Sequence, residues 1–428
     1  MNSTDPLEQG VAPREVFGWA MYDFANSGFT TVVITAVFNA YFVTTVAGNA
    51  PWATFAWTAA LSISYAAIMA SAPLVGALAD AHAAKKRLLA VTTAGCVLGT
   101  AALAGVGPGD VALGIALIAL SNFFFGSGEN IVAAFLPELA KGESLGKVSG
   151  WGWSLGYLGG LVALGACLGY VTWAQGADHT ASQFVPVTML LTAAIFALAS
   201  LPTFLLLRER ATPQTDGPRS MRGAYTRVVH TLRYASRFRD LRRFLVCLVF
   251  YQAGVQAVIA LAAIYAEQAI GFSTRDSILL ILAVNLTAAA GAFVFGYVQD
   301  RIGHLPTIAI TLAGWILTVL LAYSAEARPM FWVAANIAGL CLGASQSAGR
   351  ALVGYLSPEA RRAEFFGLWG FAVKLSSILG PLTYGATTWI SGGNHRMAML
   401  ITGVYFVFGL ALLAGVNVRR GREAAQSG

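Results

Sequence analysis

The chain has 428 residues, of which 57% are hydrophobic and 11% are charged, and its formal net charge is +7. A soluble domain carries roughly 25% charged residues, so this composition excludes a water-soluble globular protein. It indicates an all-α membrane protein, because lipid favours apolar side chains on the outside of helices as well as between them.

Twelve apolar runs are long enough to cross about 30 Å of hydrocarbon as helices. The loops between them are short, except for the stretch 208–240. Lysine and arginine concentrate in the loops on one side, which predicts that both termini are cytoplasmic; we expect the bacterial cytoplasmic (inner) membrane. The predicted spans are 17–47, 52–79, 88–106, 110–136, 148–170, 184–207, 241–269, 277–298, 305–325, 329–350, 363–390 and 396–417.

The first span contains a carboxylate, Asp23, with Asn26 and Ser27 three and four residues later. On a helix these three side chains share one face. The group is suited to binding a proton or the amine of a substrate. The alternative is an aspartate that bridges helices and stabilises the first bundle.

The second and eighth spans end in related loops, which indicates an internal duplication. Gly76 and Asp80 are matched by Gly296 and Asp300 at an offset of 220 residues, and basic residues follow both copies. The repeat predicts two six-helix halves, 1–207 and 241–428, joined by a cytoplasmic linker, 208–240. We expect acids and bases of these loops to pair across a cytoplasmic gate in one conformation and to separate in another. The predicted gate residues are Asp80, Lys85, Arg87, Asp300 and Arg301.

Charged side chains inside spans are costly and normally face the bundle interior or water. Glu129 and Arg350 occupy equivalent places in the two halves, each eight residues before a loop proline. We hypothesise that they face one central cavity, where they bind the two ends of a zwitterion or form a gate pair. Lys374 is expected to pair with Glu129 or Asp23, or to extend to the membrane surface. The predicted cavity residues are Asp23, Asn26, Ser27, Glu129, Asn130, Gln256, Gln346, Arg350 and Lys374, with Asn285 and Asn336 as further amide candidates.

The linker has apolar residues at helical spacing between arginines, from Tyr225 to Leu241. This pattern predicts a basic amphipathic helix that lies on the cytoplasmic membrane surface. Binding of a soluble partner is the alternative.

Both loop motifs resemble the signature that follows the second helix of the major facilitator superfamily, and the second copy, 300–303, fits it better. The resemblance implies that superfamily's fold, two six-helix bundles around a central cavity. More narrowly, residues 19–27, 251–256 and 343–347 resemble motifs of its vacuole effluxer branch. That branch implies export of amino acids or similar solutes, although Ala253 stands where the family usually has an aspartate.

No phosphate-binding loop of the ATPase type is present, so the energy for transport would come from a gradient. The leading hypothesis is a secondary transporter that exports an amino acid or similar zwitterion by alternating access, coupled to protons. The alternatives are transport of drugs or lysophospholipids, and a sensor or assembly protein that keeps the fold without transport. The scattered histidines argue against an enzyme. We expect a monomer whose partners are a small solute, protons and the lipid bilayer, with no nucleic acid, cofactor or metal.

Overall fold

The computed structural model describes residues 6–213, 222–223, 225–226, 229, 238–272 and 274–427, and most of them are helical. The predicted linker helix falls for the most part outside these residues. The helices before the linker are α1 Pro13–Gly28, η1 Phe29–Ala36, α2 Phe38–Tyr41, η2 Phe42–Val46, α3 Ala53–His82, α4 Lys85–Ala102, η3 Leu103–Gly105, α5 Val111–Ala133, α6 Leu136–Leu139, η4 Gly142–Ser144, α7 Leu145–Gly176 and α8 Ala181–Leu206. Those after it are α10 Arg239–Ile270, α11 Thr274–Ile302, α12 His304–Ser324, α13 Arg328–Leu356, η5 Glu359–Arg361, α14 Arg362–Ile390, α15 His395–Leu413 and α16 Val418–Gln426.

Within the described residues, 11 helical segments are long and apolar enough to cross a membrane. The tenth predicted span, 329–350, forms the 29-residue helix α13, but its mean hydropathy is too low for it to count among these segments. Residues 341–354 of α13 are all buried, so neighbouring protein surrounds this part of the helix. A helix that does not face lipid has no need of an apolar outer surface, and α13 carries polar and small residues instead.

The first predicted span, 17–47, is not one regular α-helix. After α1 the chain continues as the π-helix η1, the short α2 and the second π-helix η2. The run from Thr30 to Thr35 is β-branched throughout, and such side chains crowd the preceding turn of an α-helix. Three threonine hydroxyls in this stretch donate to backbone carbonyls of the turn before them.

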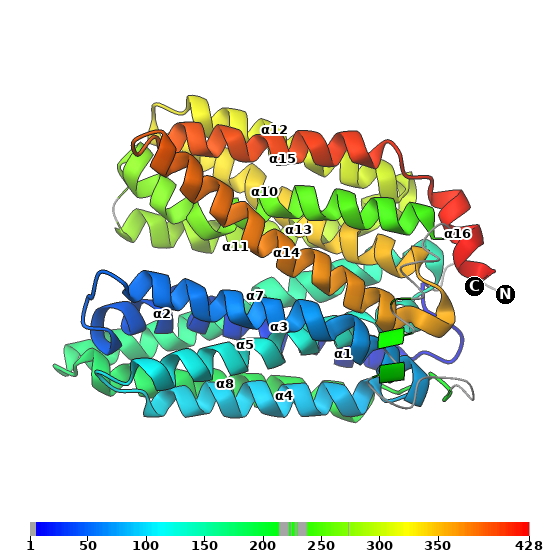
Figure 1. The fold of residues 1–428 in the computed structure, drawn as a ribbon, viewed down its shortest axis with the longest axis horizontal. Coiled ribbons are helices and arrows are strands. Elements are labelled where there is room, and N and C mark those ends of the chain that lie inside the picture. Colours follow the sequence, from blue (N-terminus) through cyan, green and yellow to red (C-terminus); the bar gives the residue numbers. More distant parts are fainter. Residues whose placement is uncertain are drawn as a thin grey trace.

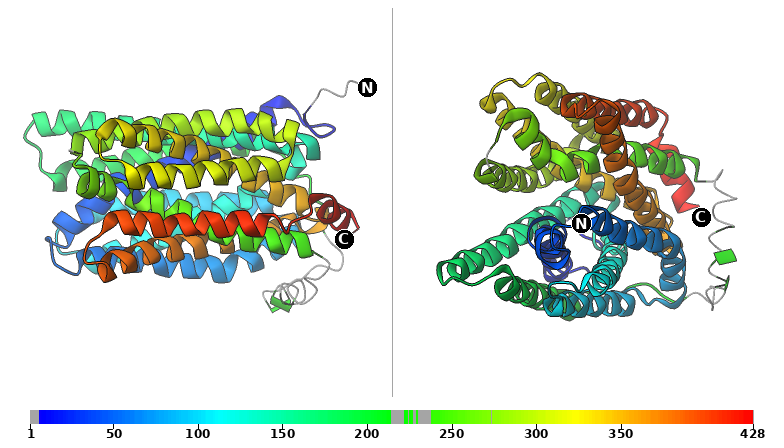
Figure 2. Two further views of the ribbon diagram at one scale, coloured as in Figure 1. Left: turned by 90° about the horizontal axis from the view of Figure 1, so that it is seen from above. Right: turned by 60° about the vertical axis from the view of Figure 1, so that its left-hand side comes forward.

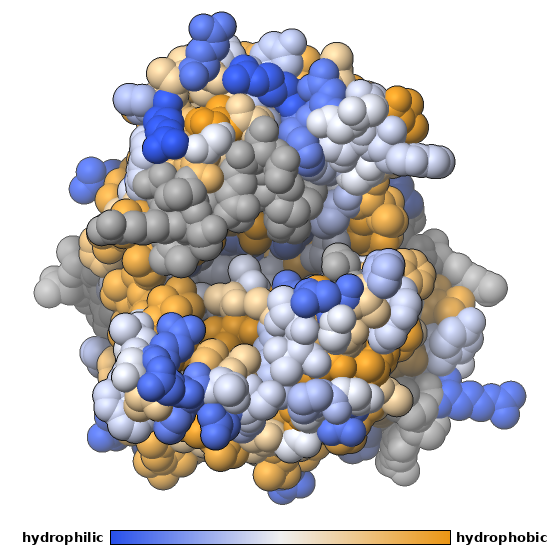
Figure 3. Space-filling view, turned by 90° about the vertical axis from the view of Figure 1, so that its left-hand side faces the viewer, coloured by the Kyte–Doolittle hydropathy of each residue, from blue (hydrophilic) through white to orange (hydrophobic). Residues whose placement is uncertain are grey.

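The helices form two groups, one from each side of the linker, which lie one above the other in Figure 1 and are separated again in the right-hand view of Figure 2. The strap 6–12, which precedes α1, and α16 lie at the same end, called here the terminal end. At the opposite end, Figure 3 shows a groove running between the two groups. The predicted boundaries of the two halves remain a prediction, since much of the linker lies outside the described residues.

Two helix pairs hold the halves together at the terminal end, α3 with α14 and α7 with α11. Both seams depend on glycine. A Cβ atom on Gly76 would lie 2.2 Å from the Ala363 carbonyl oxygen, and one on Gly150 would lie 2.5 Å from that of Ala292. Backbones can approach this closely only where a side chain is missing. Gly296, the repeat partner of Gly76, lies in the second seam, so the duplicated glycines occupy corresponding places.

A buried ion pair fixes the terminal end of the first half. Lys85, at the start of α4, donates to Glu138 of α6, and the two side chains are 1% and 6% exposed. The Lys85 ammonium also lies 5.1 Å from the centre of the Phe135 ring. Arg210 forms a second ion pair with Glu15 of α1 at 2.8 Å. These contacts join the ends of helices that are far apart in the sequence.

We expect Lys85→Met to destabilise the protein by about 3–5 kcal/mol, because removing one partner leaves a buried charge without compensation. The double variant with Glu138→Met should recover most of the loss, since the carboxylate in direct contact with Lys85 is removed together with it. Unfolding in mixed micelles of increasing denaturing detergent measures both effects. A single variant as stable as the wild type would show that Glu138 finds another partner.

Candidate functional site

Arg350 of α13 lies at the centre of a buried polar cluster between the two halves. Its Nη1 donates to Asp23 Oδ2 of α1 at 2.7 Å. Its Nε donates to Ser149 Oγ at 3.1 Å and its Nη2 to the Ser149 carbonyl oxygen at 2.9 Å. The hydroxyl of Ser149, on α7, in turn donates to the carbonyl of Ser347. The guanidinium is thus held by two helices of the opposite half.

Two indole rings flank the same guanidinium. The carbon at its centre lies 4.8 Å from the centre of the Trp19 ring and 5.3 Å from that of Trp153. Aromatic faces attract cations and also exclude water from them. Gly152 leaves the room for this cluster, because a Cβ there would lie 2.5 Å from the Asp23 carboxylate.

A second ion pair joins the halves through other helices. Lys374 of α14 donates to Glu129 of α5 at 3.1 Å. The ammonium lies 5.7 Å from the ring centres of both Tyr65 and Phe125. The Lys374 side chain is 7% exposed and that of Glu129 is 24% exposed, so the carboxylate is the more accessible member of this pair.

The two pairs share one arrangement, with the acid on the first half and the base on the second. The sequence-based hypothesis placed Glu129 and Arg350 together in one cavity, as a site for the two ends of a zwitterion or as a gate pair. In this structure they do not pair with each other, because each has a different partner, and their roles toward a solute remain a prediction. Lys374 pairs with Glu129, one of the two partners expected for it. Which face each helix turns inward depends on tertiary packing, and residue spacing does not contain that information.

The other predicted cavity residues differ in their hydrogen-bond partners and in their burial. The Ser27 hydroxyl donates to the backbone carbonyl of Asp23 and not to its carboxylate. Gln346 accepts a hydrogen bond from Gln252 of α10, while Asn26 is buried and Gln256 is half-buried. The amides of Asn285 and Asn336 donate to carbonyls of their own helices.

Asn130 is a buried amide whose oxygen and nitrogen both lack a hydrogen-bond partner. It packs against Gly370 of α14, where a Cβ would lie 2.1 Å from the amide oxygen. A buried amide without partners is costly, and this one lies where the two halves touch. If the halves separate at this point, water can form hydrogen bonds with the Asn130 amide, which lowers the free energy of the separated state.

The carboxylates of the repeated loops bridge the two seams. Asp80 accepts hydrogen bonds from the backbone N–H groups of Ala363 and Glu364 at 3.1 and 2.9 Å, at the start of α14. Asp300 accepts them from Gly146 and Lys147 at 3.0 and 3.1 Å, at the start of α7. Helix N-termini favour negative charge because their first N–H groups are unpaired.

The expected acid–base pairs across this gate are not formed in this structure. Lys85 pairs within its own half with Glu138, and Arg87 and Arg301 are exposed. The two aspartates contact helix ends of the opposite half instead. Asp80 and Asp300 do occupy corresponding places in the two seams, but the sequence offered no signal for a backbone partner, and their role in a gate remains a prediction.

We expect Asp300→Asn to weaken closure of the terminal end by about 1–2 kcal/mol, since an uncharged amide gains less from a helix N-terminus. Spin labels at Arg87→Cys and Glu359→Cys, one exposed position on each half, measure the separation of the halves. In Asp300→Asn their distance distribution should include an additional population at longer distance. The four native cysteines are buried and should not take the label. Asp178→Asn, in an exposed loop, is the control. Identical distance distributions in the three proteins would contradict the assignment.

The sequence-based prediction missed residues that surround both ion pairs. Beside Arg350 it missed the Trp19 ring and the hydrogen-bond acceptor Ser149. Beside Lys374 it missed the rings of Tyr65 and Phe125. Tryptophan and serine are common in membrane helices, so nothing in their spacing marks them. Among the described residues, no group of three or more His, Cys, Asp or Glu side chains is placed to hold a metal ion.

Comparison with solved structures shows the fold. The human organic anion transporter MFSD10 (TETRAN) superposes with a TM-score of 0.72 at 16% identity, over 94% of this chain and 100% of that one. The major facilitator superfamily transporter FucP in the outward conformation gives a TM-score of 0.70 at 14% identity, over 94% and 97% of the two chains. The architecture is that of the major facilitator superfamily.

Comparison of sequences narrows the relationship. An uncharacterized MFS-type transporter of Bacillus subtilis (strain 168), YxiO, is 24% identical over 415 residues, covering 95% of this chain and 96% of that protein. Autophagy-related protein 22 of Candida glabrata is 25% identical over 206 residues, which is 46% of this chain and 38% of that protein. A family model described as vacuole effluxer Atg22 like matches residues 52–426. The chain therefore belongs to the vacuole effluxer Atg22-like family within the major facilitator superfamily.

Proposed function

We propose that the chain is a secondary active transporter that exports a small zwitterionic solute, such as an amino acid, by alternating access coupled to protons. The observation that carries the proposal is the pair of ion bridges between the halves, Asp23 with Arg350 and Glu129 with Lys374. Each bridge closes when the halves meet and must open when they separate. A solute that binds to the bridge residues, or a proton that neutralises one of them, therefore changes the equilibrium between the closed and separated conformations.

A zwitterion suits the Asp23–Arg350 bridge better than an anion, a cation or a neutral solute. Opening the 2.7 Å contact leaves a carboxylate and a guanidinium without partners, which is costly in a buried site. A solute carboxylate can take over the guanidinium while its ammonium takes over the carboxylate. An ion of one sign compensates only one member, and a neutral solute compensates neither fully.

The acids supply the proposed coupling to protons. Protonation of Asp23 or Glu129 removes the attraction across the corresponding bridge and so lowers the cost of separating the halves. Glu129, whose side chain is 24% exposed, is the easier of the two for water to reach. By the distribution of basic loops we assign the terminal end to the cytoplasm. In this orientation the described conformation is closed toward the cytoplasm.

The test is a screen of radiolabelled amino acids and related zwitterions in proteoliposomes with an imposed pH gradient. We expect uptake or release of at least one zwitterion to depend on the gradient, and Asp23→Asn to abolish that dependence. Gradient-driven flux that is unchanged in Asp23→Asn and in Glu129→Gln would remove both acids from the coupling. A folded protein that moves no member of the panel would contradict the substrate class.

A further inference from the structure

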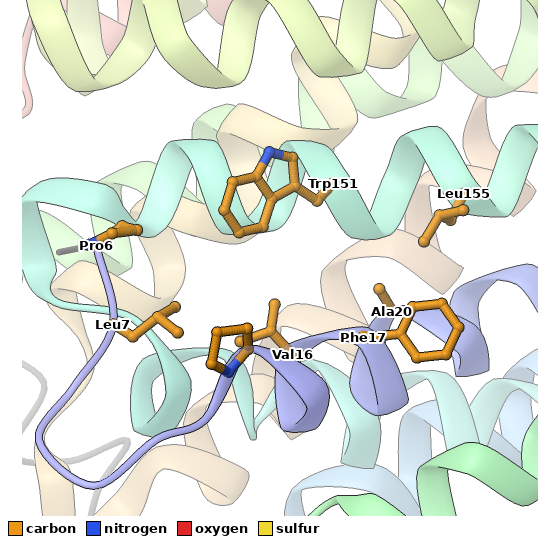
Figure 4. A pocket seen from close by; sticks show the side chains of 8 residues that line it. Pro6, Leu7, Val16, Phe17, Ala20, Trp151 and Leu155 are labelled. Carbon is orange, nitrogen blue, oxygen red and sulfur yellow. The ribbon is translucent and has the colours of Figure 1, made fainter.

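A separate apolar groove of about 360 Å³ lies between α1 and α7 at the terminal end. The residues that matter for its properties are Leu7 of the strap, Val16 and Phe17 of α1, and Trp151 and Leu155 of α7 (Figure 4). None of its lining side chains is charged. The groove is on the periphery of the first half and contains none of the residues of the two ion bridges.

The groove runs inward from the terminal end. Trp151 and Leu155 follow the start of α7 by six and ten residues, which corresponds to about 9 and 15 Å along a helix. The strap closes the outer end, where the backbone N–H of Glu8 donates to the Leu139 carbonyl at 3.1 Å and the backbone N–H of Lys141 donates to the Pro6 carbonyl at 3.1 Å. Phe17 is 51% exposed, so the groove is open to the side, toward the surroundings of the bundle.

Polarity changes along the groove in the same order as in a phospholipid. Lys147 lies one turn before Trp151 on the same face of α7 and holds its ammonium 5.3 Å from the centre of the Tyr297 ring. The indole of Trp151 donates to the Tyr297 hydroxyl at 3.2 Å. Arg14, next to the lining residue Pro13, is exposed. Cations thus lie at the outer end, amphipathic rings follow, and only apolar side chains lie deeper.

We propose that this groove binds one acyl chain of an anionic phospholipid whose phosphate lies near Lys147 and Arg14. A half-exposed apolar wall in a membrane-spanning bundle is covered by hydrocarbon, and basic residues at the headgroup level favour anionic lipids by about fivefold each. A zwitterionic lipid would fill the groove equally well but would not neutralise the two cations. The site is distinct from the proposed solute site and does not depend on the transported substrate.

Native mass spectrometry tests the proposal with full-length protein purified in micelles that contain equal amounts of phosphatidylglycerol and phosphatidylcholine. We expect the wild type to retain phosphatidylglycerol in preference to phosphatidylcholine. Lys147→Gln should reduce that preference at least threefold, because it removes charge and leaves the groove unchanged. Leu155→Trp should reduce retention of both lipids, because the larger ring occupies the space of the chain.

Matched controls separate the groove from the rest of the lipid-facing surface. Arg87→Gln removes an exposed cation at the same end, and Leu98→Trp enlarges a side chain on α4 that is 68% exposed; neither should change lipid retention. If Leu155→Trp does not fold, Phe17→Gln tests the same wall at a half-exposed position. The proposal would be overturned if the wild type, Lys147→Gln and Leu155→Trp (or Phe17→Gln in its place) retained phosphatidylglycerol equally. It would also be overturned if the control variants lost as much lipid as the groove variants.

Discussion

Replacing Arg350 by lysine is expected to reduce transport by about tenfold to a hundredfold while the protein remains folded. Lysine keeps the positive charge but loses the planar fork that donates at once to Asp23 and to both oxygens of Ser149, and that receives the solute carboxylate in the proposed mechanism. One hydrogen bond to a charged group contributes about 1.5–3 kcal/mol, and each 1.4 kcal/mol corresponds to about tenfold in rate. A compact ammonium also stacks less well between Trp19 and Trp153.

The measurement is the initial rate of solute flux in proteoliposomes containing equal amounts of folded protein. Arg208→Lys is the matched control, because Arg208 is exposed, belongs to neither the predicted gate nor the cavity, and its replacement should leave the rate unchanged. Thermal unfolding of both variants in detergent separates a loss of activity from a loss of structure. A folded Arg350→Lys protein with the wild-type rate would show that charge alone is needed at this position.

The helical architecture could be predicted because its cause is local. A run of about twenty apolar residues crosses the membrane whatever its neighbours are, and the described helices follow the predicted spans closely. The exceptions also have physical causes. The segment from Thr30 to Thr35 departs from α-helical geometry because its residues are β-branched, and α13 is too polar to be recognised by hydropathy because protein surrounds its second part.

The candidate site could be predicted in its members but not in its pairings. A charged residue inside an apolar span is conspicuous in any sequence, and this feature alone selects Asp23, Glu129, Arg350 and Lys374. Asp23 and Arg350 are separated by 327 positions, and their contact depends on how two bundles meet. The same holds for Asp80 and Asp300, whose partners are backbone groups that every sequence contains.

Replacing Gly150 by valine is expected to shift the protein strongly toward a conformation that is open at the terminal end. A Cβ at this position would lie 2.5 Å from the Ala292 carbonyl oxygen and 3.3 Å from the Gly296 Cα, so the α7–α11 seam cannot close around it. Overpacking of a tight contact costs about 1–3 kcal/mol. Because the contact exists only when the halves meet, the substitution raises the free energy of the closed state and leaves that of the open state unchanged.

Spin labels at Arg87→Cys and Glu359→Cys report the change as a greater population at long distance, by about fivefold or more for a cost of 1 kcal/mol or above. Gly165→Val provides a control on the same helix, since a Cβ at Gly165 would meet no atom within 4 Å. Gly150→Ala, with a smaller side chain, should give an intermediate shift. If Gly150→Val and Gly165→Val give the same distances as the wild type, the α7–α11 seam does not set the closed state. The closed conformation would then have to depend on the α3–α14 seam, on the ion bridges and on the two aspartates at the helix ends.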